Sequence, residues 1–358
     1  MHRIAVALVT LTVAAACSGD TGKSPDSAKA GATPAAGTSS GADLTGAGAT
    51  FPYPLYSKWF DVYASKTGVK INYQSIGSGG GIRQLSEQTV DFGATDAPMS
   101  DADLAKAKGG AVLHIPMALG AVVVTYNLPG VSKPINLTGE LVAAIFQGQV
   151  TRWNDARIAA VNPDAALPAT DILVVHRSDG SGTSFVFTDY LSAVSPAWAT
   201  KPGKGKEVQW PVGLGGKGNE GVAGQVKQTP GAIGYVELAY AKQNGLSVAL
   251  LKNGAGEFVA PSIASVTAAA AAAAASLPAT TDYRISIVNA KGHGAYPIAS
   301  FTWILAYQKQ ADPARRKKLV DFLTWALGDG QALEAPLDYA PLPESMRAGL
   351  VARLGTIQ

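Results

Sequence analysis

The sequence has few of the residues that metal binding, covalent crosslinking and catalysis need. Its single cysteine, Cys17, excludes an intramolecular disulfide. Three of its four histidines, His114, His176 and His293, lack the spacing of metal ligands. No run fits the phosphate loop G-x-x-x-x-G-K-[ST], and no strand-to-helix turn carries the G-x-S-x-G nucleophile elbow. We therefore expect no metal, no cofactor and no catalytic residue.

Charge and long apolar runs are also scarce. Charged residues make up 15% of the chain and the formal net charge is only +3, which indicates neither nucleic acid nor a strongly acidic partner. The N-terminal apolar run, Ile4 to Ala16, is too short to span a bilayer, because a spanning helix needs roughly 20 apolar residues. Its basic start at His2 and Arg3 and its small residues at the end predict an export signal over residues 1–16.

Cys17 follows three alanines, an arrangement that resembles a lipoprotein processing box, although Ala14 stands where such boxes usually carry Leu. Simple cleavage, with Cys17 as an incidental thiol, is the alternative. We favour lipidation because residues 17–43 are rich in Ser, Gly, Ala, Thr and Pro and carry no large apolar residue, as in a flexible linker. The protein would then sit on the outer face of the cell membrane, or in the periplasm without the lipid.

The chain from Leu44 to Gln358 is long enough for two domains. Strand-like and helix-like segments alternate along it, which predicts an α/β fold with a largely parallel sheet. Strands are expected around residues 69–74, 90–95, 111–115, 121–126, 172–177 and 232–236. Helices are expected after a Thr50 cap, from about residue 82, after a Ser100 cap, at 141–146, after 178–183, at the surface along the alanine run 268–275, and at 319–326.

Three strand-to-helix turns carry small polar residues: Thr50-Phe51, Ser78 within a glycine cluster, and Ser181-Gly182-Thr183. Helix starts have free N–H groups and a positive dipole end, so each turn is a candidate anion site. Ordinary helix capping is the better interpretation for any one of them alone. Three together with Arg177 at a strand end favour an anion, because a guanidinium can bind two oxygens of a tetrahedral oxyanion.

Asp179 follows Arg177 by two residues, so it can hold the guanidinium in place, and a purely structural salt bridge between them is the alternative. Residues 216–221 fit the spelling G-x-G-x-x-G. Because residues 210–214 before them make a poor buried strand, we interpret this run as a turn.

Six segments resemble the phosphate-binding proteins of the high-affinity phosphate ABC transporter. They are residues 44–52 (LTGAGATFP), 76–78 (IGS), 90–98 (VDFGATDAP), 179–185 (DGSGTSF), 213–219 (GLGGKGN) and 230–237 (PGAIGYVE). The resemblance covers essentially the whole chain after residue 43. It departs at Gly79, where many relatives have a second Ser, and along the alanine run.

The resemblance implies a two-lobed periplasmic-binding-protein fold, with residues 44–118 and 297–358 in one lobe and 119–296 in the other. The chain would cross the hinge near Met117–Gly120 and near Tyr296–Ile298. It further implies a monomer that passes phosphate to the permease subunits of an importer. The implied phosphate ligands are Thr50, Phe51 through its backbone, Ser78, Asp96, Arg177, Ser181, Gly182 and Thr183.

Asp96 gives this implied site its selectivity. Two like unit charges 4 Å apart repel by about 4 kcal/mol at a surface-like dielectric, so a carboxylate opposes a fully deprotonated oxyanion. Phosphate near neutral pH keeps a proton that the carboxylate can accept, whereas sulfate has none. Asp96 therefore argues against a sulfate or molybdate receptor.

Two other functions stay open. An exported phosphatase would need a base and usually metal ligands beside Ser78, Ser181 or Thr183, and the sequence shows none. A phosphate scavenger that no longer serves a transporter would have the same binding residues, so the sequence cannot separate it from a transport receptor.

Overall fold

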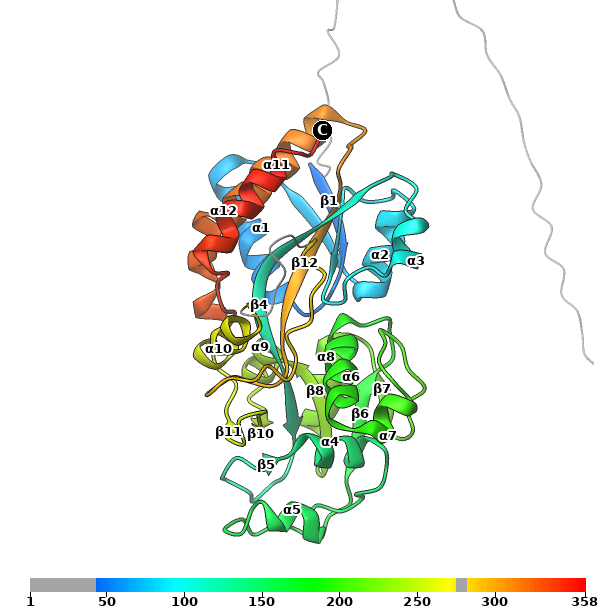
Figure 1. Cartoon of the computed structure of the whole chain (residues 1–358), viewed down its shortest axis with the longest axis vertical. Coiled ribbons are helices and arrows are strands. Elements are labelled where there is room, and N and C mark those ends of the chain that lie inside the picture. Colours follow the sequence, from blue (N-terminus) through cyan, green and yellow to red (C-terminus); the bar gives the residue numbers. More distant parts are fainter. Residues whose placement is uncertain (1–42, 275–281) are drawn as a thin grey trace, which may run out of the picture. The chain divides into compact units, whose positions relative to one another are not determined.

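The computed structural model describes residues 43–274 and 282–358 (Figure 1). The predicted signal peptide, Cys17 and nearly all of the predicted linker lie outside the described residues, as does Ala275 at the end of the alanine run. Among the helices within the described ranges, none has both the length and the apolar character needed to cross a bilayer.

Strands and helices alternate along the chain, as predicted. The strands are β1 (Leu44–Gly48), β2 (Ile71–Ser75), β3 (Phe92–Thr95), β4 (Val112–Tyr126), β5 (Asn136–Leu137), β6 (Leu173–Arg177), β7 (Leu214–Gly216), β8 (Ala232–Glu237), β9 (Ser247–Val248), β10 (Leu250–Lys252), β11 (Phe258–Val259) and β12 (Ala299–Tyr307). The α-helices are α1 (Tyr53–Thr67), α2 (Ser78–Ser86), α3 (Asp101–Ala105), α4 (Gly139–Phe146), α5 (Ala156–Ala160), α6 (Gly182–Val194), α7 (Pro196–Thr200), α8 (Gly218–Gln228), α9 (Leu238–Gln243), α10 (Ile263–Ala274), α11 (Pro313–Leu327) and α12 (Glu344–Leu354). Two 3₁₀ turns, Asp329–Leu333 and Ala335–Leu337, lie between α11 and α12.

The described residues form a nine-stranded mixed sheet, with strand order β2-β1-β3-β12-β4-β8-β6-β7 and β9 attached to β4. β1 is parallel to β2 and β3, and β6 is parallel to β7 and β8. β4 and β12 run antiparallel to their neighbours. The α/β class is confirmed, but the sheet is not largely parallel, because β4 carries the chain out of one parallel group and β12 returns it.

β4 corrects a prediction, since the two strands expected at residues 111–115 and 121–126 are one continuous, mostly buried strand. It pairs with β12 as far as Ala121 and with β8 from Val122 onward. A register shift against β12 leaves Met117 unpaired next to Pro116. Proline donates no ladder hydrogen bond, and such a bulge accommodates it without ending the strand.

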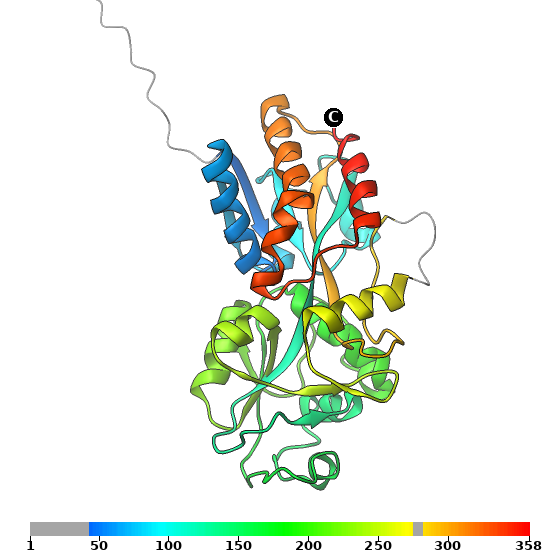
Figure 2. The same cartoon turned by 90° about the vertical axis from the view of Figure 1, so that its left-hand side faces the viewer.

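We use two names for the parts of this sheet. The first section comprises β2, β1, β3, β12 and residues 112–121 of β4, and the second section comprises residues 122–126 of β4, β8, β6 and β7. Both views show β4 running from one section into the other (Figures 1 and 2). Around the first section, α1, α11 and α12 lie on one side and α2 and α3 on the other (Figure 1).

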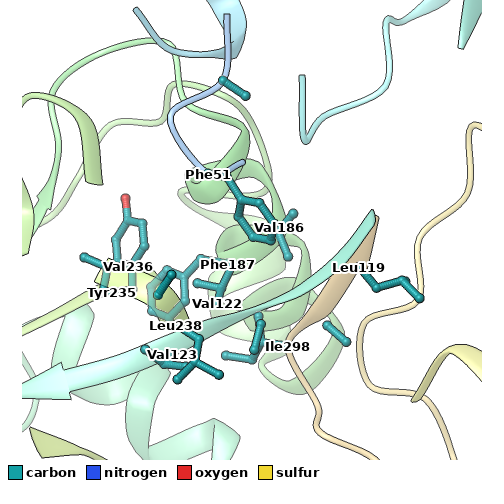
Figure 3. Packing of buried hydrophobic residues seen from close by; sticks show 14 of the residues in the cluster. Phe51, Leu119, Val122, Val123, Val186, Phe187, Tyr235, Val236, Leu238 and Ile298 are labelled. Carbon is teal, nitrogen blue, oxygen red and sulfur yellow. The ribbon is translucent and has the colours of Figure 1, made fainter. Parts of the chain in front are cut away.

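One hydrophobic cluster contains side chains from both sections. The part around β4 includes Val122 and Val123 of the strand itself, Phe51 at the start of α1, Phe187 of α6 and Ile298 before β12 (Figure 3). Burial of this apolar surface stabilises the crossing between the sections and fixes the loop that carries Phe51.

Two helix starts differ from prediction. No side chain caps α1, whose N-cap residue is Pro52 rather than Thr50. α2 begins at Ser78, four residues earlier than expected, so its first turn contains three glycines. Glycine is a poor helix former, but an added Cβ on Gly81 would lie 2.5 Å from the Cα of Gly48. The close approach of two backbones therefore outweighs helix propensity here.

The predicted surface helix along the alanine run is α10, and it is not confined to the surface. Ala269 and Ala270 are buried, and the helix contacts β4 and β12. The small side chain of alanine allows this close approach to the sheet.

Candidate anion-binding site

The eight residues implied as phosphate ligands are all buried, and they lie where strands end and helices begin. Thr50 and Phe51 follow β1, Ser78 begins α2, Asp96 follows β3, and Arg177 ends β6. Ser181 is the N-cap residue of α6, and Gly182 and Thr183 form its first turn. In open α/β sheets, ligands bind beyond the carboxyl ends of the strands, where these turns lie.

Gly182, in the helix that follows β6 of the second section, packs directly against residues that follow β2 and β3 of the first section. An added Cβ on it would lie 2.4 Å from the Ser78 hydroxyl oxygen and 2.5 Å from Asp96 Oδ2. Nearby, the N–H of Gly79 donates to the carbonyl of Gly180 at 2.8 Å. Residues 86 to 104 positions apart in the sequence thus share one site, and only glycine fits between them.

The guanidinium of Arg177 is held from two directions. Its Nε and Nη2 donate to the carboxylate of Asp179 at 2.7 and 2.5 Å, and its Nη1 donates to the hydroxyl of Thr183 at 3.2 Å. Burial acts to raise the pKa of Asp179, but the hydrogen bonds and charge of Arg177 outweigh it and keep that pKa below its ordinary value. The site therefore contains a buried, oriented cation.

Asp96 lies against Ser78 and Thr302. Its Oδ1 accepts a hydrogen bond from the Thr302 hydroxyl at 2.8 Å, and its own N–H donates to Ser78 Oγ at 3.1 Å. Burial raises the pKa of the Asp96 carboxyl to about 7, against the opposing effects of Thr302, Arg177 and Ser78. Near neutral pH this carboxyl can accept a hydrogen bond when ionised or donate one when protonated.

Four backbone N–H groups at the site, those of Phe51, Ser78, Gly182 and Thr183, have no hydrogen-bond acceptor among the described residues. All four belong to buried residues at or just before helix starts, where the helix itself supplies no acceptor. Buried N–H groups without a partner are costly. Together with Arg177, they form a surface of donors suited to an anion.

Capping explains only one of the three polar turns. The Ser181 hydroxyl accepts from the N–H of Ser184 at 2.9 Å and caps α6. Neither Thr50 nor Ser78 caps its helix.

The structure adds Asn219, which the sequence analysis missed. The run interpreted as a turn is the end of β7 followed by the start of α8, so a fourth strand-to-helix connection reaches the site. The side-chain nitrogen of this buried residue donates to the hydroxyls of Thr50 and Thr183 at 2.8 and 3.0 Å. The G-x-G-x-x-G spelling was the available signal. The residues before this spelling lack the pattern of a buried strand because β7 is an edge strand whose Leu214 is exposed.

The histidines occupy separate environments. His114 accepts from the N–H of Met99 at 3.0 Å, and burial lowers its pKa to about 4. His176 stacks on Trp210 with ring centroids 4.8 Å apart, and His293 is exposed beside Glu257. Within residues 43–274 and 282–358, no three His, Cys, Asp or Glu side chains are grouped as metal ligands would be.

A family model described as the PBP superfamily domain matches residues 29–329. The chain belongs to the PBP superfamily. Among curated proteins, this PBP-superfamily chain is 48% identical to the phosphate-binding protein PstS of Xylella fastidiosa strain Temecula1, covering 87% of this chain and 85% of that one. It is 46% identical to PstS of Pasteurella multocida, covering 85% and 87%. These identities place it within the family of the PstS proteins.

The fold is also similar to that of a high-affinity periplasmic phosphate-binding protein, PfluDING, solved with phosphate bound. The TM-score is 0.68 at 22% identity, and the similarity covers 87% of this chain and 93% of the other. The periplasmic-binding-protein fold that the sequence predicts is thereby confirmed.

Proposed function

We propose that this chain binds one inorganic phosphate ion between the two sections of its sheet and delivers it to an ABC importer. The observation that supports this best is the meeting of four unpartnered N–H groups and one buried guanidinium with Asp96, the one carboxyl group among the implied ligands. Membership of the PstS family agrees with it, because the curated relatives carry the name phosphate-binding protein.

In this proposal the deprotonated phosphate oxygens accept from the N–H groups, from Arg177 and from the Thr50, Ser78, Ser181 and Thr183 hydroxyls. The remaining proton is shared with Asp96. A carboxyl group whose pKa is raised to about 7 matches this role, because the proton can lie on either partner at similar cost.

The two sections would act as lobes, formed by residues 44–118 with 297–358 and by residues 119–296. Contacts between them at Gly79 and Gly182 support a site that closes around its ligand. We further propose that the chain is exported, that a lipid on Cys17 anchors it, and that it works as a monomer with the permease subunits.

We propose that the chain is not an enzyme. The sequence suggested no base near Ser78, but the structure corrects this, because Asp96 Oδ2 lies 3.5 Å from the Ser78 hydroxyl. The same hydroxyl accepts from the Asp96 N–H and Gly182 packs against both residues, so the Ser78 oxygen is already engaged. Turnover of p-nitrophenyl phosphate that persists through purification would contradict this proposal.

Calorimetric titration of the purified chain with phosphate and with sulfate at pH 5, 7 and 8.5 tests the function. We expect one phosphate per chain and no heat from sulfate at pH 7. Equal binding of both ions would contradict a phosphate-selective site. Deletion of the gene, with phosphate uptake as readout, separates a transport receptor from a scavenger.

A further inference from the structure

The hydroxyl groups of Thr50 and Thr183 each accept two hydrogen bonds. Thr50 Oγ1 accepts from the backbone N–H and the side-chain nitrogen of Asn219, at 3.2 and 2.8 Å. Thr183 Oγ1 accepts from the Asn219 side-chain nitrogen at 3.0 Å and from Arg177 Nη1 at 3.2 Å. A hydroxyl oxygen has two lone pairs and one hydrogen, so all four lone pairs are in use. Each hydroxyl can therefore act further only as a donor.

The orientation of the Asn219 amide is fixed by its oxygen. Asn219 Oδ1 accepts from the backbone N–H of Glu237 at 2.9 Å. A flipped amide would set its NH₂ group against that N–H and its oxygen against the two hydroxyl oxygens, which loses three hydrogen bonds. Asn219 is completely buried, so water cannot replace them.

We propose that Asn219 is a positioning residue that makes the Thr50 and Thr183 hydroxyls obligatory donors to the bound anion. The proposal rests on the proposed phosphate function and adds an orientation to it. Neither Thr50 nor Thr183 can then accept the phosphate proton, because the lone pairs of both hydroxyls are already in use. The protonated oxygen is then directed to Asp96, the one carboxylate among the implied ligands.

A purely structural role is the competing explanation, since Asn219 also ties the start of α8 to β8 through Glu237. A double-mutant cycle separates the two roles. If Asn219 acts through the threonine hydroxyls, its loss must matter only while those hydroxyls are present. If it only supports the local fold, its loss must matter equally without them.

The experiment measures phosphate affinity by calorimetry for Asn219→Ala in the parent chain and in a Thr50→Val/Thr183→Val background. We expect a loss of about 10- to 100-fold in the parent, because hydrogen bonds to a charged ligand are weakened. In the valine background the further loss is expected to be less than about threefold. An equal loss in both backgrounds, or unchanged affinity of Asn219→Ala in the parent, overturns the proposal.

A parent chain that fails to bind phosphate overturns the proposed function and this inference together, whereas the outcomes above overturn the inference alone. Asn219→Leu, which fills a similar volume, replaces the alanine variant if that variant does not fold. Asn253→Ala is the matched control, because Asn253 is also a buried asparagine and its amide donates to the carbonyls of Gly292 and Ala295. This control is expected to lower the melting temperature and leave phosphate affinity unchanged.

Discussion

At the scale of single residues, the sequence indicated which side chains to examine but not how they are paired. The Arg177–Asp179 pair follows from a spacing of two residues, and the structure contains it. Asn219 could not be found in this way, because its partners Thr50 and Thr183 are 169 and 36 residues away and nothing local marks them. The raised pKa of Asp96 likewise depends on burial, which no residue pattern shows.

Replacing Asp96 tests selectivity. Asp96→Asn removes the charge that repels sulfate, while the amide can still hydrogen-bond to a phosphate oxygen. We expect phosphate affinity to fall modestly, by about tenfold, and sulfate to bind measurably. In the parent chain, sulfate competition is expected to strengthen as the pH falls below 7, because a protonated Asp96 can donate to it. Sulfate still excluded from the variant would assign selectivity to other groups.

Asp96 also predicts a pH-dependent stability. Its pKa is about 7 when folded and about 4 in an unfolded chain, so the folded state binds this proton more tightly. The stabilisation from this group is complete below about pH 4 and is lost as the pH rises through 7. Urea unfolding without phosphate should therefore show the parent losing stability relative to Asp96→Asn between pH 5 and 8. Parallel curves for the two proteins would contradict the raised pKa.

At the scale of elements, most helices and strands were predictable, because apolar periodicity and caps are local signals. The Ser100 cap of α3 is confirmed, and Asp103 completes a capping box there. The errors occur where distant backbones decide the outcome. The start of α2 depends on close contact with Gly48, and the continuity of β4 depends on pairing with β12 past Pro116.

The first turn of α6 offers a test of the close approach between sections. Gly182→Ala would place a methyl group in the position occupied by the Ser78 hydroxyl and Asp96, so we expect phosphate affinity to fall about tenfold or more. Gly224→Ala in α8 is the control, since an added Cβ there contacts nothing within 4 Å and alanine favours the helix. Calorimetry and thermal melting of both variants check this. Normal affinity of Gly182→Ala would mean that the sections do not approach this closely with the ligand bound.

At the scale of the whole described unit, charged side chains join the two proposed lobes at the edge of the site. Lys206 Nζ lies 2.9 Å from Asp103 Oδ2, and Arg284 Nη1 lies 2.7 Å from Asp101 Oδ1. The carbonyl of Lys206 accepts from the N–H of Ser181, so the first of these pairs connects α3 to the start of α6. Both partners of that pair are about one-quarter exposed. We therefore expect the pair to make a small contribution to closure of the site, and one that salt weakens.

Lys206→Met is expected to weaken phosphate binding by about two- to fivefold at low salt and by less at 1 M salt, where charges are screened. Lys317→Met, which removes an exposed pair within α11, is the control and should leave affinity unchanged. Titrations at two salt concentrations check both variants. A salt-independent loss for Lys206→Met would indicate that packing of the lysine chain matters rather than its charge.

The unbroken course of β4 limits how one half of the protein can rotate against the other. Its 15 residues are hydrogen-bonded to β12 on one stretch and to β8 on the next, so no single pair of free dihedral angles separates the halves. Any rotation must be distributed as extra twist and bend over several successive peptide units near the bulge at Met117, where the ladder is already interrupted. We expect any such rotation to be shared among these peptide units rather than concentrated at one residue.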